Sequence, residues 1–375
     1  MPLLSWFLFA SVFIGAHAAT SDIRAREAQV EAGNPAYMEG KGVTLLGHVD
    51  LRKIADLPNS DVSVSNGYAY AGTYSVPGRV YVVDVNDPTN PTVVAVYEPS
   101  VRARVLDVHA QGPLLYVALS QAAVDIVDVS DPTSPALLAQ YTEGIPLGVH
   151  NVSATDTHMF LTNNGNGRFH IVDVSDPAGP FEVLAFQPSG SNHDAKIVGT
   201  KAYLANLLGG FQILDISDTG SPAVLATRTY PGAFTHDAWP SHEETYLCTT
   251  DETCGRGHLR VWDISNLGDI RQIGEYTAPG SEQTTVHKAV WHGNFVFMSY
   301  YHRGLRVADV SNPSQPTEAA FFETWDGTRR LFGCYDGAWG VSVEQIGKTT
   351  RIYVIDISTG LWIFDLDAPN PLSKN

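Results

Sequence analysis

The stretch "RVYVVDVNDPTNP" (residues 79–91) decides the fold, because six variants of it follow along the chain. They read "AVDIVDVSDPTSP" (123–135), "RFHIVDVSDPAGP" (168–180), "GFQILDISDTGSP" (210–222), "HLRVWDISNLGDI" (258–270), "GLRVADVSNPSQP" (304–316) and "GLWIFDLDAPNP" (360–371). The alternating apolar residues predict a strand, and the prolines, which fix φ and cannot donate to a ladder, predict a turn after it. The aspartate that ends each apolar run recurs every 42 to 48 residues, with a longer last step, at Asp84, Asp128, Asp173, Asp215, Asp263, Asp309 and Asp365.

Each repeat contains four short strand signals bounded by Gly, Pro, Asn and Asp. In the fourth repeat they read "HDAKIVG", "KAYLAN", "GFQILDIS" and "AVLATRTY". Four strands in a period of 40 to 50 residues indicate one blade of a β-propeller. The sequence therefore predicts an all-β, seven-bladed β-propeller that forms a single domain over residues 42–370.

The seventh repeat lacks a fourth strand, since the chain ends soon after Asp365. A spare strand signal, "GVTLLGHVDL", begins at Gly42, before the first blade. Pairing of Val43–Leu51 with Leu361–Leu366 would complete the last blade and protect both edges of the sheets. We therefore expect an N-terminal strand to close the ring.

The first residues resemble a secretory signal. Residues 1–19 form an apolar run that ends in Ala16-His17-Ala18, the small-x-small pattern of a signal peptidase site. No Lys or Arg precedes the run, so an uncleaved anchor is the alternative. The interpretation makes residues 20–41 an N-terminal extension and the protein secreted, either extracellular or periplasmic, without stable membrane insertion.

The net charge argues against some kinds of binding partner, and the cysteine spacing suggests one disulfide. The net charge of −17 argues against a nucleic-acid partner and against an anionic membrane surface. Cys248 and Cys254 flank "TTDET", which we expect to be a hairpin tip, so a Cys248–Cys254 disulfide is predicted. Cys334 is left as either a buried apolar residue or a functional thiol.

The repeated L/F-x-I/V-x-D-V/I-S-D-P frame resembles the LVIVD-repeat family. The resemblance covers about residues 42–370 and is specific, because seven copies fit it. It implies a β-propeller on a cell surface or in a secreted protein. It implies little about activity, because the family includes adhesion-type surface proteins.

Aligning the first strands of the seven repeats produces two columns that behave differently. One column holds Asp61, Asp107, Asn151, Asp194, Asp237, Lys288 and, across an insertion, Asp336. The preceding column holds Ser60, Leu106, His150, His193, His236, His287 and Tyr335. The acidic column follows the whole repeat, so its simplest role is to accept hydrogen bonds from backbone N–H groups at the start of each inner strand. Histidine occupies only four consecutive repeats, which a purely structural role does not explain.

First strands line the central channel of a propeller, so the four histidines are expected at one height on one arc. Imidazole is a frequent ligand of Fe, Cu and Zn, whereas Ca and Mg prefer oxygen. We predict a divalent transition metal held by four ligands, with Asp194 and Asp237 as acceptors for the second ring nitrogens. Metal-free acid–base or binding use, and a purely structural role, are the alternatives. The four ligands are His150, His193, His236 and His287.

The loops that enter the first strands are expected to surround the mouth of this channel. Among them, Arg102 and Arg329 could orient an anionic group, and Tyr335 could serve as an acid or base. They favour a small anionic or sugar-like ligand, although exposed loops commonly carry Arg and Tyr without any such role.

Three functions fit these patterns. The first is a metal-dependent enzyme with lyase, isomerase, hydrolase or oxidoreductase chemistry. The second is a non-catalytic binding or adhesion propeller, and the third is a metal-free lyase in which the histidines act directly. The chain contains no G-x-S-x-G, Walker, dinucleotide-binding or H-E-x-x-H motif, so nucleophilic and nucleotide chemistry have no support.

Overall fold

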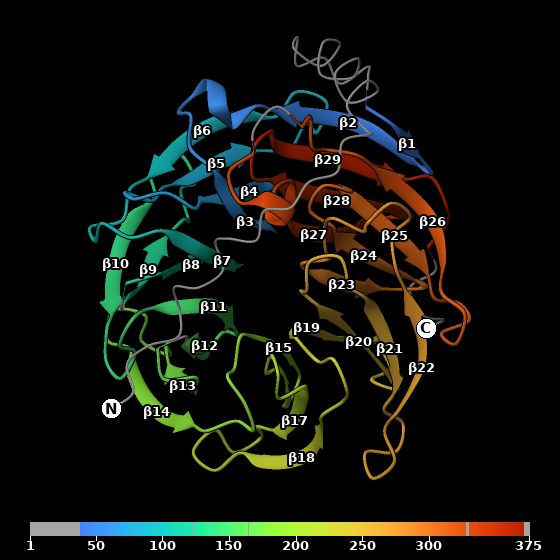
Figure 1. The fold of residues 1–375 in the computed structure, drawn as a ribbon. Coiled ribbons are helices and arrows are strands. Elements are labelled where there is room, and N and C mark those ends of the chain that lie inside the picture. The colour runs from blue at the N-terminus through green and yellow to red at the C-terminus, as the bar shows by residue number, and fades with distance from the viewer. Residues whose placement is uncertain (1–37, 122, 164, 328–329, 371–375) are drawn as a thin grey trace.

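The computed structural model describes residues 38–121, 123–163, 165–327 and 330–370. The predicted signal at 1–19, most of the extension at 20–41 and Arg329 lie outside the described residues. The described chain forms seven sheets arranged in a ring, with one strand of each facing the axis (Figure 1). The predicted all-β, seven-bladed propeller is therefore confirmed.

The first four blades follow the chain, and each runs from the inner strand outward. Blade one contains β3 (Asn59–Ser65), β4 (Tyr68–Thr73), β5 (Val80–Asp84) and β6 (Thr92–Tyr97). Blade two contains β7 (Val105–Gln111), β8 (Leu114–Leu119), β9 (Ala123–Asp128) and β10 (Ala136–Tyr141). Blade three contains β11 (Val149–Ala154), β12 (His158–Asn163), β13 (Phe169–Asp173) and β14 (Phe181–Phe186). Blade four contains β15 (Asp194–Val198), β16 (Lys201–Ala205), β17 (Phe211–Asp215) and β18 (Ala223–Arg228).

The last three blades keep this order and add the N-terminal strands. Blade five contains β19 (Thr235–Pro240), β20 (Tyr246–Asp251), β21 (Leu259–Asp263) and β22 (Arg271–Tyr276). Blade six contains β23 (Ala289–His292), β24 (Phe295–Ser299), β25 (Leu305–Asp309), β26 (Thr317–Phe322) and β1 (Gly40–Lys41). Blade seven contains β27 (Ala338–Ile346), β28 (Thr349–Asp356), β29 (Gly360–Leu366) and β2 (Val43–Val49). Within the described residues, two short 3-10 helices lie in the connections: η2 (Leu51–Lys53) and η3 (Gly333–Tyr335).

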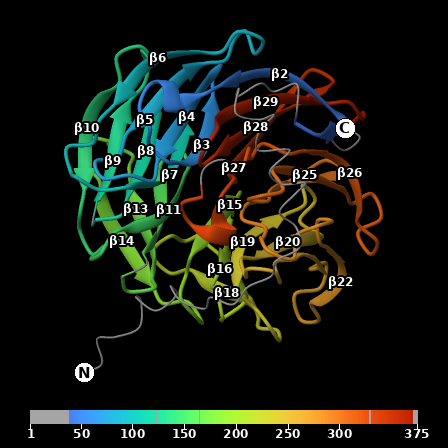
Figure 2. The same cartoon turned by 45° about the horizontal axis from the view of Figure 1, so that its top comes forward.

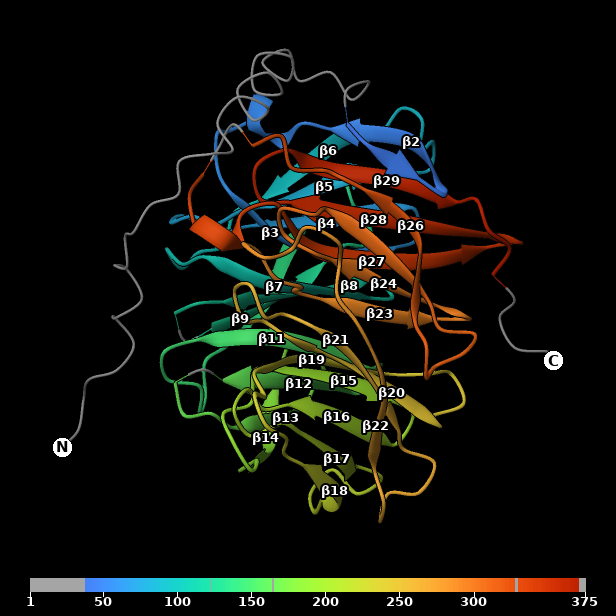
Figure 3. The same cartoon turned by 45° about the vertical axis from the view of Figure 1, so that its right-hand side comes forward.

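The ring closes as the sequence predicts. Strand β2 pairs antiparallel with β29, from Val43 opposite Leu366 to Val49 opposite Leu361, and the two lie side by side in Figure 2 and Figure 3. Leu51 belongs to η2 instead of the strand. Strand β1 adds a fifth strand to blade six, which the sequence did not reveal because two residues carry no periodicity.

The repeated aspartates explain why the frame recurs. In the first six blades the aspartate ends the third strand and accepts a hydrogen bond from the backbone N–H two residues on, as Asp128 does from Ser130 at 2.8 Å. This side-chain turn fixes the bend toward the fourth strand. In blade seven Asp365 instead receives hydrogen bonds from Arg351, because the chain does not turn into another strand there.

Apolar side chains between neighbouring blades form the core. The cluster between blades six and seven includes Phe297, Trp362 and Phe364, all almost completely buried. Sheets packed in this way provide a rigid frame for residues that point to the axis. In the described part of the chain, no helix has the length and apolar character needed to cross a membrane.

Candidate metal centre in the central channel

A β-bulge near the start of two inner strands carries two of the predicted histidines. The register of β11 with β12 shifts between Val149 and Asn151, and that of β19 with β20 shifts between Thr235 and Asp237. His150 and His236 are the extra residues at these bulges. A bulge bends the strand and redirects one side chain, which is why each histidine leaves the alternation of its strand.

The other two histidines occupy the same place in their blades. The backbone N–H of His193 donates to the carbonyl of Ala205 at 2.8 Å, and that of His287 donates to the carbonyl of Ser299 at 2.9 Å. His193 therefore directly precedes its inner strand β15, and His287 lies two residues before β23. The fold therefore places the four histidines of the predicted column next to one another.

The assignment of blade seven to the two columns was wrong. Here the bulge lies between Ala338 and Gly340, so Trp339 takes the place of the histidine and Gly340 that of the aspartate, instead of Tyr335 and Asp336. The inner strands of this blade are longer than in the others, and residue counting failed for that reason. A Cβ on Gly340 would lie 2.2 Å from Oδ1 of Asp61, which explains why this position carries no side chain.

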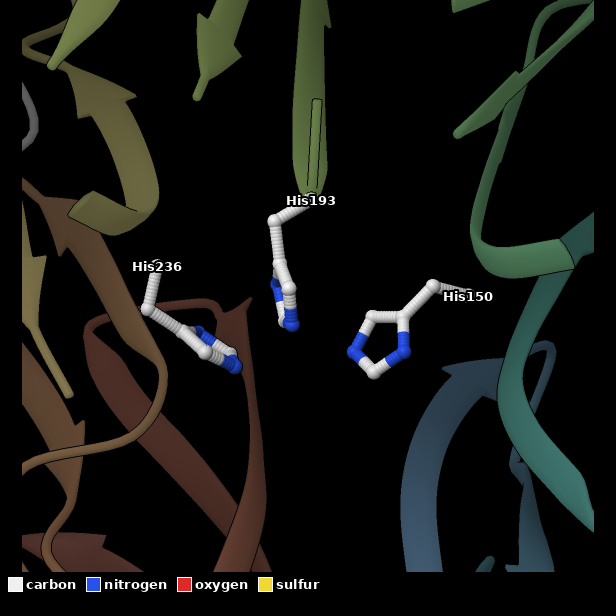
Figure 4. A group of neighbouring side chains, drawn as sticks. All are labelled: His150, His193 and His236. Carbon is white, nitrogen blue, oxygen red and sulfur yellow. The ribbon is translucent and has the colours of Figure 1, made fainter. Parts of the chain in front are cut away.

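The four imidazoles form a continuous arc. Ring centroids are 3.8 Å apart for His150 and His193, 4.3 Å for His193 and His236, and 4.1 Å for His236 and His287. Figure 4 shows the first three rings converging on one space. One donor nitrogen from each of these three lies within 4.8 Å of the others. A tetrahedral ion with bonds of 2.0–2.1 Å needs donors about 3.4 Å apart, which lies within this limit.

Burial keeps the four rings uncharged. It is the largest cause that lowers the pKa of His150 to about 4 and that of His287 to about 3. The pKa values of His193 and His236 also lie well below the usual range, because burial is reinforced by neighbouring histidines. Neutral imidazole is the form that can bind a metal.

Hydrogen bonds hold some of these rings and leave others open to a ligand. Nδ1 of His287 lies 2.6 Å from the carbonyl of Trp339, which assigns the proton to Nδ1 and leaves Nε2 as a free lone pair. Nδ1 of His193 and Nδ1 of His236 are buried and have no hydrogen-bond partner. Buried polar atoms are normally satisfied by protein, water or an ion, so these two nitrogens fit a bound metal. Thr162 and Thr250 fix the backbone by donating to the carbonyls of His193 and His287.

Glu252 joins the site from the loop after β20, and the sequence columns did not reveal it. Its carboxylate lies 3.7 Å from Nε2 of His236, and together with His287 the two residues form a second group of donor atoms within 4.8 Å of one another. Tyr301 donates to it at 2.5 Å. Burial raises the pKa of Glu252 to about 7. Glu252 directly follows the second strand of its blade, where blade one has Tyr74 and blade two has Ser120. A carboxylate at this position is its only signal in the sequence.

The acidic column forms a second ring directly beside the histidines. Asp107 accepts from the backbone N–H of Val152 in the next blade at 2.8 Å, and Asp237 accepts from Ala289 in the same manner at 2.9 Å. Asp194 accepts from its neighbour Ala195 at 2.7 Å. These bonds agree with the expected capping role. A contact of Asp194 or Asp237 with a metal-bound imidazole stays a prediction.

Lys288 crosses the channel and neutralises part of this acidic ring. Its ammonium contacts Asp61 of blade one and lies 3.3 Å from Asp107 of blade two. The pKa of Lys288 is well above its usual range, because these carboxylates outweigh the burial of the amine. Between the ring and the histidines lies a cavity of about 10 Å³, lined by His150, His236 and His287 among others.

A larger cavity of about 430 Å³ reaches His193 from the loop face. Its lining residues are Leu147, Gly165, His193, Leu207, Phe234, Glu252 and Tyr335. Tyr335 lines this cavity from η3 instead of from the inner strand, and its role as an acid or base stays a prediction. Arg102 is exposed, and its role in orienting an anionic group stays a prediction. The guanidinium of Arg104 lies 5.0 Å from the centre of the Tyr74 ring.

The predicted Cys248–Cys254 disulfide is wrong, since all three cysteines are unbonded. Strand β20 continues to Asp251, so "TTD" belongs to the strand and the hairpin tip begins later. Cys248 pairs in the ladder with Val261 and is completely buried, whereas Cys254 is exposed in the loop. Three strand residues at about 3.3 Å each separate Cys248 from the end of β20.

Comparison with known families agrees with this repeat. LVIVD repeats are found at residues 59–98, 104–143, 157–187, 189–227 and 289–324, which lie in blades one to four and in blade six. This chain is an LVIVD-repeat protein. The resemblance of the repeated frame to that family is thereby confirmed. A search of curated proteins gave no match to this LVIVD-repeat protein.

Solved structures similar to the LVIVD protein include two β-propeller domains. The β-propeller domain of Cps50 (Swd1) from Myceliophteria thermophila is 11% identical with a TM-score of 0.62, over 86% of this chain and 99% of that one. The WD40 β-propeller domain of Doa1 is 15% identical with a TM-score of 0.60, over 86% and 97%. The computationally designed Ika8 protein is 9% identical with a TM-score of 0.54, over 85% and 98%. At these identities the similarity shows the fold alone.

Proposed function

We propose that this LVIVD propeller binds a divalent transition metal through His150, His193 and His236, with His287 and Glu252 as adjoining donors. The supporting observation is that uncharged imidazoles from four consecutive blades meet at one end of the channel. Nitrogen donors favour Zn, Fe or Cu over Ca or Mg. The combination of two histidines and one carboxylate is also a ligand set of non-haem Fe(II) sites.

We further propose that the protein is an enzyme acting on a small molecule in the cavity above the histidines. A bound metal would supply a Lewis acid or a redox centre. Glu252 can accept or release a proton near neutral pH, because burial raises its pKa to about 7. The hydroxyl of Tyr301 orients this carboxyl group toward His236 by donating to one of its oxygens. Tyr335 is the second polar group available to a substrate in this cavity.

The cavity favours a substrate with an apolar body and one polar or anionic group. Leu147, Leu207 and Phe234 provide apolar walls. Arg104 is the cation we propose for an anionic group, because it lies over Tyr74, whose ring is 5.2 Å from that of Trp339. The roles of Arg102 and Arg329 remain proposals from sequence, and so does secretion, which rests on the pattern of residues 1–19.

A non-catalytic binding propeller is the second candidate. It is favoured by two leucines at or next to this cavity, Leu147 and Leu208, whose side chains are 76% and 78% exposed. Exposed apolar residues around a hollow are typical of ligand or partner sites. In that case the histidines would bind a ligand directly, without a metal.

Metal analysis of the purified protein separates the two candidates. We expect about one transition-metal ion per chain, and visible d–d absorption when Co(II) replaces it. His193→Ala should weaken metal binding by at least about 100-fold, since even residues that only support ligands cost 10- to 100-fold. The matched control is His242→Ala, an exposed histidine on the other face, which should bind normally. A metal-free protein that also fails to bind Co(II) would refute the proposal.

A further inference from the structure

Two cysteines flank the polar residues of the loop-face cavity. Cys254 follows Glu252 by two residues, and Cys334 directly precedes Tyr335. Both lie at the end of the propeller where the histidines open, one in the loop after β20 and the other in η3. Because blade six separates the two segments in the sequence, their approach is a product of the fold.

Thr284 holds the two segments against each other. The backbone N–H of Gly255 donates to the carbonyl of Thr284 at 2.8 Å, and the hydroxyl of Thr284 donates to the carbonyl of Cys334 at 3.0 Å. A second connection runs through Tyr301, which donates to Glu252 and packs edge-on against Tyr335 with ring centroids 5.5 Å apart. The backbone segments that carry the two cysteines are thus connected through Thr284 and through Tyr301.

The two thiols lie between these connections and interact with each other. The Cys334 thiol lies beside the Cys254 thiol, and this neighbour adds to burial in raising the pKa of Cys334 to about 12. Cys254 is exposed and Cys334 is half-buried, so an external reagent reaches Cys254 first. Cys248 is fully buried in the core between blades and takes no part.

We propose that Cys254 and Cys334 are a redox modification site that forms a reversible disulfide across the mouth of the cavity. The thiolate of Cys254 attacks one sulfur of a low-molecular-weight disulfide such as oxidised glutathione, and one thiol leaves. The thiol of Cys334 loses its proton to water and attacks the Cys254 sulfur, so that the second thiol leaves. Two electrons pass from the protein to the reagent, and the Glu252 loop becomes bonded to η3.

The test is mass mapping of the full-length protein after incubation in glutathione redox buffers. Free thiols are alkylated in the native state, and peptides are analysed without reduction. We expect one linked peptide pair carrying Cys254 and Cys334, two hydrogens lighter than the thiol forms and lost after treatment with dithiothreitol. Cys248 should be alkylated only after unfolding.

Cys334→Ser supplies the matched control, because removal of the second thiol should leave Cys254 as a stable glutathione adduct. The proposal would be overturned by wild-type protein that accumulates the same adduct while Cys334 stays alkylatable. A disulfide that includes Cys248 would overturn it as well. None of these readouts depends on a bound metal, so failure here is independent of the proposed metal centre.

Discussion

Replacement of Lys288 by methionine tests whether the channel is held by a buried charge balance. One ammonium faces two buried carboxylates, those of Asp61 and Asp107. Lys288 helps to lower the pKa of Asp61, whereas burial and the neighbouring Asp61 raise that of Asp107 well above its usual range. The two carboxylates therefore share one compensating charge, and Asp107 is the one that binds a proton more readily.

The expected loss can be worked out from protonation. Without Lys288, Asp61 must bind a proton to remain buried, and its pKa in the unfolded chain is about 3.9. At pH 7 this protonation costs about 4 kcal/mol, because each pH unit corresponds to about 1.4 kcal/mol. The value agrees with the roughly 3–5 kcal/mol lost when one partner of a buried ion pair is removed.

The pH dependence gives the direction of the effect. In Lys288→Met the pKa of Asp61 is higher in the folded protein than in the unfolded chain. The variant therefore loses stability as the pH rises from the unfolded pKa toward the folded pKa. The deficit relative to the wild type should fall to about 1.5 kcal/mol at pH 5. Lys288→Met/Asp61→Asn removes the charge and should recover most of the loss.

Urea unfolding at pH 5 and pH 7 measures these differences. Arg271→Met is the matched control, because its ion pair with Asp269 is exposed to solvent and should contribute little to stability. A loss below about 1 kcal/mol for Lys288→Met, or a loss that does not change with pH, would show that the ammonium is not paired across the channel.

Three further outcomes are expected. Burial lowers the pKa of Lys196 to about 8, so Lys196→Met should raise the free energy of unfolding at pH 7 by up to about 3 kcal/mol. Urea unfolding should show that this gain becomes smaller as the pH rises toward 10.5. Gly340→Ala should cost roughly 1–3 kcal/mol in the same assay, because its Cβ would collide with Asp61. Deletion of residues 1–50 removes β2 and exposes the edge of β29, so gel filtration should detect association of the truncated protein.

The fold was predictable because the same sequence pattern occurs seven times. The alternation in "RVYVVDVNDPTNP" gives the third strand, and the aspartate that ends it closes the turn to the fourth. The unpaired signal at Val43–Val49 could be matched to the incomplete last blade for the same reason. Strand β1 escaped because a two-residue strand contains no repeat to compare.

The candidate site was predictable only where it follows the repeat. The four histidines share one alignment position, so their common height could be anticipated. Glu252 could not, because it stands in a loop whose length and composition change from blade to blade. The cysteine pairing failed for a related reason: the end of β20 decides which residues face each other, and sequence patterns locate strand ends poorly.

In blade seven, Trp339 and Gly340 replace the histidine and the aspartate that the repeat would place there. With Trp339 where a fifth histidine would stand, the arc ends, and the indole ring lies 4.7 Å from the imidazole of His287. The carbonyl of the same residue accepts the proton of His287 Nδ1, so one tryptophan both limits the cluster and fixes the tautomer of its last member. At Gly340, absence of a side chain admits the carboxylate of Asp61, which binds Lys288 below the histidines. The departures from seven-fold symmetry thus place four uncharged imidazoles on one arc. The paired charges of Lys288 and Asp61 stay in the neighbouring ring of acidic residues.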